Sequence, residues 1–277
     1  MKNKEVSLQC YEQFSAFLEK QCGIVLGTNK QYLVRSRLSP LLYQHPYDQI
    51  DDLIRAVLAN RDRGLLQDVI DAMTTNETLW FRDTYPFELL KTHLLPQLKS
   101  AKRRIRIWSA ACSSGQEPYS IAMTLMEYKR QHPGALPHGA EIVATDLSSS
   151  MLAKCQEGIY DELSLARGLS PERRQRFFSN HASGMMQINQ DIRAMVSFRS
   201  INLLHSYAGL GRFDIVFCRN VLIYFAPLVK QQILQQIAAQ LQPGGMLFLG
   251  ASESIGNAGE HFTMHRCQPG LYYQRKD

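Results

Sequence analysis

The sequence predicts an α/β protein in which a parallel sheet, covered by helices on both faces, follows a small all-helical region. From about residue 102, strand-like apolar runs alternate with amphipathic helices. These runs are almost continuously apolar, which is typical of strands buried on both faces of a sheet. Before residue 85 there is no convincing strand, and apolar residues recur at helical spacing. We therefore expect a helical domain with its linker over residues 1–85 and a sheet domain over residues 86–277.

The helical pattern of the first region rests on three groups of apolar residues, each spaced by three or four positions. They are Tyr11, Phe14, Phe17 and Leu18, then Leu33, Leu38, Leu41 and Leu42, then Leu53, Ile54, Val57 and Leu58.

In the second region the expected strands are 104–111, 141–147, 213–220, 246–252 and 271–275. The expected helices are 117–131, 148–156 and 227–242. Residues 176–200 interrupt the alternation, because RFFSNH, MMQIN and MVSFR resemble three short strands separated by turn-like residues. We expect a short antiparallel β insertion there.

Composition narrows the class of protein. The 277 residues carry a net charge of +6, which is too mild to indicate a nucleic-acid partner. The six cysteines are scattered without a C-x-x-C pair, so we expect no metal and a reducing compartment. No secretory signal follows the start MKNKEVSLQC, and no run approaches the roughly 20 apolar residues of a membrane span. We therefore expect a cytoplasmic protein that is not inserted in a membrane.

Small residues follow the first expected strand, in the loop 110–115. Backbone built from small residues can approach a ligand closely, and ligands of such sheets bind beyond the carboxyl ends of the strands. The loop has one glycine, so it is a weak dinucleotide motif. Glu117, at the start of the next helix, suits a ligand with an ammonium group. Alternatively, Glu117 has no ligand and simply stabilises the N-terminus of the helix through the helix dipole.

An acidic residue, Asp146, ends the second expected strand. A carboxylate at this place typically accepts hydrogen bonds from ribose hydroxyls. The alternative is a cap for the helix that begins near Ser148. Taken with the small-residue loop and Glu117, Asp146 favours an adenosyl ligand with an amino acid tail. S-adenosylmethionine fits that description better than NAD.

Two further segments contain polar residues that a buried core does not require. Arg219 and Asn220 stand where the strand FDIVFC ends, and Tyr224 follows about one helical turn later, either at the same edge or as a packing residue. The segment TTNETLWFRD, residues 74–83, changes from polar to aromatic just before the sheet domain. A lid or a substrate-facing helix would explain this composition.

These segments, in order, carry a resemblance to a known family. TTNETLWFRD, RIWSAACSSGQEPYSIAM, ATDLSSSMLAKCQEGIY, INLL, FDIVFCRNVLIYF and QPGGMLFLGASES resemble the CheR family of chemotaxis receptor methyltransferases over nearly the whole chain. The resemblance implies a Rossmann-like, S-adenosylmethionine-dependent methyltransferase domain with a small helical N-terminal domain and a β insertion. It also implies an activity, the conversion of glutamates on bacterial chemoreceptors to γ-methyl esters with S-adenosylhomocysteine as product.

The resemblance places nine residues around S-adenosylmethionine. They are Asn76, Thr78, Arg82, Glu117, Asp146, Asn202, Leu203, Arg219 and Asn220. The first three would approach from the N-terminal side. Glu117 would hold the amino group, Asp146 the ribose, and residues 202–203 the adenine. Residues 219–220 would lie near the transferred methyl.

Arg82 and Tyr224 resemble the residues that orient the acceptor carboxylate, and we take them as the catalytic pair. A glutamate has a pKa near 4.3 and is ionised at neutral pH, so it needs no general base. No histidine lies in the motifs. Catalysis would come from alignment, which can supply about 7–11 kcal/mol of a barrier.

The resemblance also implies a docking surface for the cytoplasmic helical bundle of transmembrane chemoreceptors. Residues 20–47 contain four bases and no acid, and Arg35 and Arg37 fall on an expected helix, 24–42. That helix would face the acidic methylation helices, or it would be an ordinary solvated face. The segment HASGMMQINQD lacks a glycine-rich loop, so we expect no dependence on a C-terminal receptor pentapeptide.

Two rival functions remain. A nucleic-acid methyltransferase would typically show D/N-P-P-Y/F/W where this chain has residues 219–222, and its partner would favour a stronger positive charge. A non-catalytic S-adenosylmethionine-sensing or receptor-scaffold module would retain the same cofactor residues.

Overall fold

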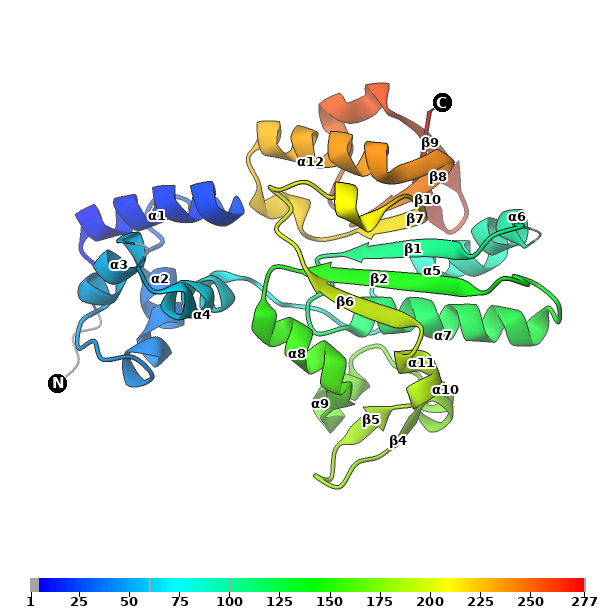
Figure 1. Cartoon of the computed structure of the whole chain (residues 1–277), viewed down its shortest axis with the longest axis horizontal. Helices are drawn as coiled ribbons and strands as arrows, with labels where there is room; N and C mark the ends of the chain where they lie inside the picture. Colours follow the sequence, from blue (N-terminus) through cyan, green and yellow to red (C-terminus); the bar gives the residue numbers. More distant parts are fainter. Residues whose placement is uncertain (1–4, 60, 100, 277) are drawn as a thin grey trace. The chain divides into compact units, whose positions relative to one another are not determined.

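The chain forms two compact units. The computed structural model describes residues 5–59, 61–99 and 101–276. The first unit comprises Met1–Thr75 with Tyr224–Val229, and the second comprises Asn76–Ile223 with Lys230–Asp277. The expected division at residue 85, which assigns the segment 76–85 to the helical part, stays a prediction. Figure 1 gives the element labels used below.

The regular elements of the first unit over residues 5–75 are helices, as expected. Its elements are α1 (Leu8–Cys22), α2 (Gln31–Leu38), η1 (Ser39–Tyr43), α3 (Ile50–Leu58) and α4 (Arg63–Met73). The hydroxyl of Ser7 caps α1 by accepting from the Cys10 amide. Phe14, Leu18 and Leu38 are fully buried and form part of the core.

The expected helix over residues 24–42 is wrong in its first part. Residues 24–30 have no helical structure, and α2 begins only at Gln31. Gly23 adopts a left-handed conformation with φ 78° and its amide closes α1 onto the Glu19 carbonyl. Asn29 is also left-handed, with φ 64°. A helix cannot continue through left-handed residues, so α2 can begin only after Asn29.

The main sheet of the second unit has seven strands in the order β6-β2-β1-β7-β8-β10-β9. They are β1 (Ile105–Ala110), β2 (Ala140–Asp146), β6 (Val196–Ser200), β7 (Phe213–Cys218), β8 (Leu241–Leu249), β9 (Phe262–Cys267) and β10 (Gly270–Arg275). The first five strands of that order run parallel, and β10 pairs antiparallel with both of its neighbours, β8 and β9. The predicted α/β class with a mostly parallel sheet is confirmed.

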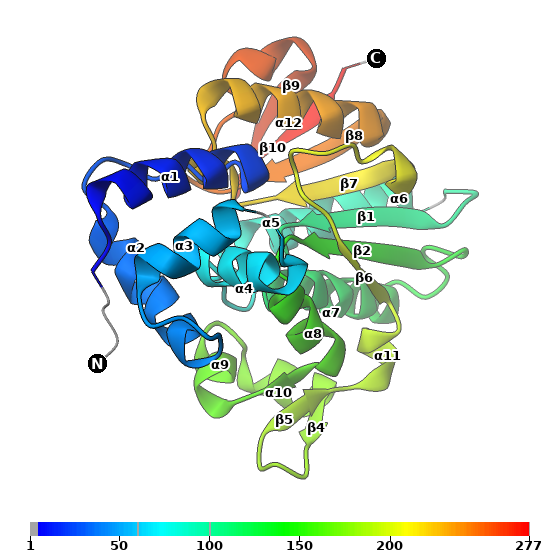
Figure 2. The ribbon, with the colours of Figure 1, turned by 60° about the vertical axis from the view of Figure 1, so that its left-hand side comes forward.

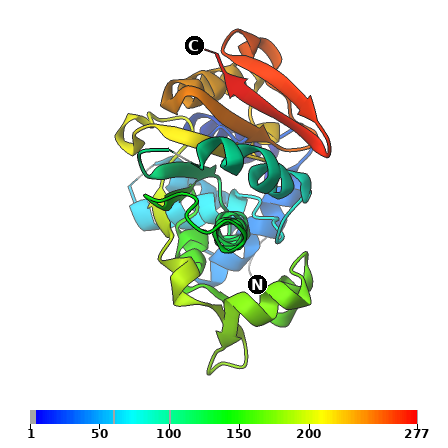
Figure 3. The ribbon, with the colours of Figure 1, turned by 90° about the vertical axis from the view of Figure 1, so that its right-hand side faces the viewer.

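Helices flank the sheet. The segment before β1 contains α5 (Tyr85–Leu89), the π turn η2 (Leu90–Leu94) and α6 (Leu95–Leu98). Helices α7 (Gln116–Gln131) and α8 (Ser149–Glu157) pack against β2 and β6. Helix α12 (Pro227–Gln240) joins β7 to β8 and lies on the other side of the sheet from α7 (Figure 3). Short 3₁₀ turns complete the unit: η3 (Ala208–Leu210), η4 (Leu222–Tyr224) and η5 (Gly256–Glu260).

The core strands are buried because both faces are covered. Every residue of β7 is buried, and in β1 only Arg106 is partly exposed. Trp108 stacks on Phe213 and donates its indole N–H to the Thr145 hydroxyl at 2.9 Å. This polar handle explains how a tryptophan can lie at the centre of the sheet.

The β insertion differs from the expected one. The small antiparallel sheet consists of β3 (Ile159–Tyr160), β5 (Met186–Ile188) and β4 (Phe178–Asn180), in that order. It belongs to a segment that also carries α9 (Glu162–Ala166), α10 (Pro171–Phe177) and α11 (Gln190–Arg193), beyond the β6 edge of the main sheet (Figures 1 and 2).

The expectation that MVSFR is a strand of this insertion is wrong. Residues 196–200 form β6, which pairs with β2 in parallel from Ile142↔Val196 to Asp146↔Ser200. The third strand of the small sheet is instead Ile159–Tyr160, two residues that no local pattern singles out. Pairing with β2 is a long-range property, and the five residues of β6, three half-buried and two exposed, are compatible with either sheet locally.

A helix that crosses a membrane must be both long and apolar. In the ranges that the structure describes, no helix has both the length and the apolar character that a membrane crossing requires.

Candidate functional site

The carboxyl ends of β1, β2 and β7 meet at one edge of the main sheet. Ala110 at the end of β1 pairs with Thr145 on one side and with Cys218 on the other. Asp146 and Arg219 each come one residue after these partners. The topology therefore brings together the small-residue loop, Asp146 and Arg219, as the sequence predicted.

Asp146 is held between two backbone segments. One carboxylate oxygen accepts from the Ser113 amide at 2.7 Å and the other from the Ser148 amide at 2.9 Å. Ser148 itself caps α8, because its hydroxyl accepts from the Met151 amide at 3.2 Å. Ser148 rather than Asp146 is therefore the cap residue of α8, and the buried Asp146 carboxylate accepts from the amide of that cap residue.

Gly115 is required by the packing beneath the loop. Its φ is +95°, and a Cβ there would meet the Tyr160 hydroxyl at 2.9 Å and the Cys155 sulfur at 3.1 Å. Ala111 and Ser113 are also left-handed, with φ 59° and 49°. The loop backbone thus has a fixed, uncommon shape against which a ligand can lie closely.

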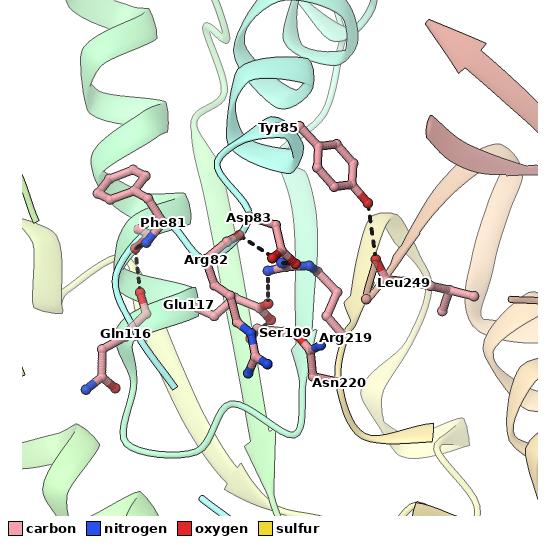
Figure 4. Close-up of polar contacts among 12 residues, drawn as sticks. Phe81, Arg82, Asp83, Tyr85, Ser109, Gln116, Glu117, Arg219, Asn220 and Leu249 are labelled. Atoms are coloured by element: carbon pink, nitrogen blue, oxygen red, sulfur yellow. Dashed lines mark hydrogen bonds and ion pairs between the residues drawn. The ribbon is translucent and has the colours of Figure 1, made fainter. Parts of the chain in front are cut away.

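Arg219 joins three segments through its guanidinium (Figure 4). Nη1 donates to Oε2 of Glu117 at 2.9 Å, and Nη2 donates to Oδ2 of Asp83 at 2.7 Å and to the Arg82 carbonyl at 2.8 Å. The other oxygen of Glu117 accepts from the Ser109 hydroxyl at 2.8 Å. The three groups form an ion triad in which only 1% of the Arg219 side chain is exposed, against 13% for Glu117 and 30% for Asp83.

The charges of the triad do not balance. The three groups alone sum to one negative charge, and Arg82 adds positive charge near Glu117. Burial raises the pKa of the Glu117 carboxyl, and Arg219 and the Ser109 hydroxyl only partly offset that rise. Among the described residues, the buried Nε of Arg219 has no hydrogen-bond partner. A ligand that brings positive charge and also an acceptor for Nε would satisfy both features.

The group that fits is the amino acid tail of S-adenosylmethionine. Its ammonium and sulfonium groups supply positive charge near Glu117, and its carboxylate can accept from Arg219. Asp146, beyond the adjacent strand, suits a ribose. The residues present therefore fit this cofactor. In the parts of the chain that the structure covers, no three His, Cys, Asp or Glu side chains gather to hold a metal ion.

Left-handed backbone concentrates around Arg219. Phe81, Asp83 and Thr84 have φ of 49°, 64° and 54°, and Asn220 has φ 59°. Each such non-glycine residue costs of order 1–3 kcal/mol and persists only where its surroundings fix it. The Phe81 amide, for example, donates to the Ser120 hydroxyl at 3.1 Å. The segment is therefore pre-organised.

The remaining expected cofactor residues lie in the second unit. The Asn76 carbonyl accepts from the Ser113 hydroxyl at 2.9 Å, which places it beside the small-residue loop. Arg82 donates to the Glu77 carbonyl at 3.1 Å, and Thr78 lies half-buried between them in sequence.

Residues 202–203 follow the end of β6. The amide of Ile201 donates to the Asp146 carbonyl at 3.0 Å, so the pair begins one residue beyond a contact with β2. Leu203 is buried, and the Asn202 side chain accepts from the Leu204 amide at 3.0 Å.

Arg35 and Arg37, the two predicted docking residues, make different contacts within the first unit. Arg35 is half exposed and pairs with Glu5 at 3.2 Å. Arg37 instead donates to the carbonyls of Met73 and Thr74 and to the Thr75 hydroxyl, the last at 2.7 Å. Arg37 therefore fastens the end of α4.

Tyr224 ends η4, and its carbonyl accepts from the Val25 amide at 3.2 Å, a contact within the first unit.

Three residues that hold the site side chains or their backbone were not singled out from the sequence: Asp83, Ser109 and Glu253. Asp83 is the third member of the ion triad, and the Ser109 hydroxyl donates to Glu117. Glu253 accepts from the amides of Asn220 and Gly250, both at 2.7 Å. The available signal for Glu253 was an acidic residue just beyond a buried strand at the ligand edge.

The fold and the site define an S-adenosylmethionine-dependent methyltransferase. The chain belongs to the CheR methyltransferase family. Residues 76–271 match the profile described as CheR methyltransferase, SAM binding domain, and residues 9–74 match CheR methyltransferase, all-alpha domain. The resemblance inferred from the motifs is confirmed, as is the Rossmann-like fold with a helical N-terminal domain.

Named relatives cover nearly the whole chain. The chemotaxis protein methyltransferase of Vibrio parahaemolyticus is 56% identical over 271 residues, 98% of either chain. Chemotaxis protein methyltransferase 1 of Pseudomonas aeruginosa is 55% identical over 96% of this chain and 97% of its own. The chemotaxis protein methyltransferase of Salmonella typhimurium is 35% identical over 92% of this chain and 86% of its own.

Proposed function

We propose that this chain transfers the methyl group of S-adenosylmethionine to glutamate side chains of bacterial chemoreceptors, forming γ-methyl esters. The observation that carries the proposal is the ion triad that buried Arg219 forms with Glu117 and Asp83 at the sheet edge. It offers complementary charge to a cationic methyl donor. The names of the relatives support the chemotaxis role.

In this proposal Glu117 and Arg219 hold the amino acid tail, Asp146 the ribose, and residues 202–203 the adenine. Residues 76–82 approach from the side of the segment that follows α4. The left-handed loop around Gly115 lets the backbone lie close to the adenosyl group. S-adenosylhomocysteine, which lacks the positive charge on sulfur, is the product.

The cofactor supplies a methyl group activated by a positively charged sulfur. The acceptor carboxylate is ionised at neutral pH, so the protein need not remove a proton. Its oxygen forms a bond to the methyl carbon while the carbon–sulfur bond breaks. We assign Arg82 and Tyr224 to holding the acceptor in line. Such alignment can account for about 7–11 kcal/mol of the barrier.

The proposed partner is the cytoplasmic helical bundle of transmembrane receptors, which would place the enzyme in the cytoplasm. Exposed Arg35 suits an acidic helix, whereas Arg37 would contribute only if it left its contacts with the end of α4. We retain the expectation that no C-terminal receptor pentapeptide is needed. We also expect no nucleic-acid partner.

The test is a transfer assay with methyl-labelled S-adenosylmethionine and a purified cytoplasmic receptor fragment. Label should enter the fragment and leave as volatile methanol under mild alkali, which identifies a carboxyl methyl ester. The matched acceptor has its candidate glutamates replaced by glutamine and should take no label. Cofactor binding without labelling of any receptor would reject the proposal and favour a sensing or scaffold module.

A further inference from the structure

The Glu253 carboxylate accepts hydrogen bonds from backbone amides of the loop that follows β7 and of Gly250. Its Oε2 accepts from the amides of Asn220 and Gly250, both at 2.7 Å. Its Oε1 accepts from the amide of Ile223 at 3.3 Å. The loop is therefore fixed at both ends by a residue 33 positions away from Asn220.

The geometry requires an acceptor without protons at this place. Three N–H groups converge on the two oxygens, and an ionised carboxylate is an acceptor only. The approach is also close, because a Cβ on Gly250 would lie 2.7 Å from both the Asn220 side-chain nitrogen and Oε2 of Glu253. The absence of a side chain at Gly250 therefore leaves the space in which the Glu253 carboxylate binds the Asn220 amide.

The conformation held in this way is an uncommon one. Asn220 is left-handed, with φ 59°, and it directly follows the buried hub Arg219. Glu117 and Asp83 hold the Arg219 guanidinium, while Glu253 holds the next residue's amide. Without Glu253, nothing of comparable strength among the described contacts fixes the backbone of Asn220.

We infer that Glu253 is a positioning residue that sets Arg219 and Asn220 for cofactor binding and methyl transfer. The inference rests on the proposed function and extends it, because no motif argument gave Glu253 a role. Glu253 acts through the loop and contacts neither the cofactor nor the acceptor in this account.

The experiment compares Glu253→Ala, Glu253→Gln and the control Glu260→Gln in the full chain. Glu260 is an exposed glutamate seven positions on, whose carboxylate pairs with neighbouring His261. Binding of S-adenosylmethionine is measured by calorimetry without any acceptor. Transfer to the receptor fragment is measured as kcat and KM, and each variant's folded fraction at the assay temperature is measured by circular dichroism.

Glu253→Ala should weaken cofactor binding at least about tenfold and lower kcat by a larger factor, because three amides lose a charged acceptor. Glu253→Gln should fall between it and the wild type. Its amide oxygen can still accept from Asn220 and Gly250, but its NH₂ then faces the Ile223 amide. The KM for the receptor should stay within about twofold in all three variants, since the loop acts on the cofactor side.

The inference is overturned if Glu253→Ala binds the cofactor as the wild type does. It is also overturned if its loss of activity matches its unfolded fraction, which is what a purely structural residue would give. If Glu253→Ala does not fold, Glu253→Gln decides by the same criteria. Absence of transfer by the wild type would reject the receptor as acceptor, whereas the calorimetric comparison would still stand.

Discussion

Replacing Arg219 by methionine should destabilise the protein strongly at neutral pH. Methionine keeps much of the volume but removes the charge that Glu117 and Asp83 share. The Glu117 side chain is 13% exposed and the Asp83 side chain 30%, so the first carboxylate is left with little access to water. Most of the cost should therefore come from Glu117.

The magnitude follows from the burial of the triad. Removing one partner of a buried ion pair typically costs about 3–5 kcal/mol. For a unit of this size, 1 kcal/mol lowers the Tm by about 2–4 °C, so we expect a drop of about 6–20 °C at pH 8. A surface control, Arg55→Met, removes a guanidinium that is 61% exposed and pairs with Asp51 and Asp52, and it should cost no more than about 1 kcal/mol.

The same variant carries a signature in its pH dependence. Burial already raises the pKa of Glu117, and loss of Arg219 should raise it further. The folded variant then keeps a proton that the unfolded chain releases near pH 4.3, so stability is lost as pH rises through the folded pKa. The deficit should be smaller at pH 5.5 than at pH 8 by scanning calorimetry. A Tm within 2 °C of the wild type at pH 8, or a deficit independent of pH, would refute this reasoning.

Three further predictions concern single positions. Asp146→Asn should weaken S-adenosylmethionine binding by about 10–100-fold in calorimetry, because an amide cannot accept from both flanking amides and also serve a ribose; unchanged binding would contradict the assignment. Gly115→Ala should lower the free energy of unfolding, measured by urea titration, by more than about 1 kcal/mol, given its φ of +95° and the 2.9 Å approach to Tyr160, and an unchanged free energy would show that the loop can relax. Arg37→Met should lower the Tm more than Arg35→Met, because it frees three acceptors at the end of α4; if Arg35→Met alone weakens binding of the receptor fragment, docking belongs to Arg35.

Local patterns revealed most of the fold because its strands are buried. The runs at β1, β2 and β7 are apolar enough to be recognised singly, and their ends point to Asp146, Arg219 and Asn220. Strand β9 was not recognised because it is an edge strand in which five of six residues are exposed or half-exposed, so its sequence has little apolar signal.

The missed parts depend on contacts between distant positions. Asp83 lies 136 positions from Arg219, and nothing in the local sequence distinguishes it from a surface acid. Arg37 and the end of α4 are also distant in sequence. From the sequence alone, the charged helix face suggested docking, whereas the structure shows that Arg37 also binds the residues that follow α4. The identity of β6 was lost for the same reason, since only its register with β2 separates it from the insertion.

The left-handed residues around the site also bear on how this chain could be engineered. Among the described residues, eight non-glycine residues have positive φ, and six of them flank the ligand edge: Phe81, Asp83, Thr84, Ala111, Ser113 and Asn220. Glycine would relieve backbone strain at those whose side chains are small or exposed, such as Thr84 and Ala111, so a search for thermostable variants should be drawn to these positions. Every such gain would loosen a segment that the reaction needs held still. Selection for heat tolerance and selection for turnover should therefore compete at the same few codons, and stabilising changes compatible with activity should accumulate elsewhere in the chain.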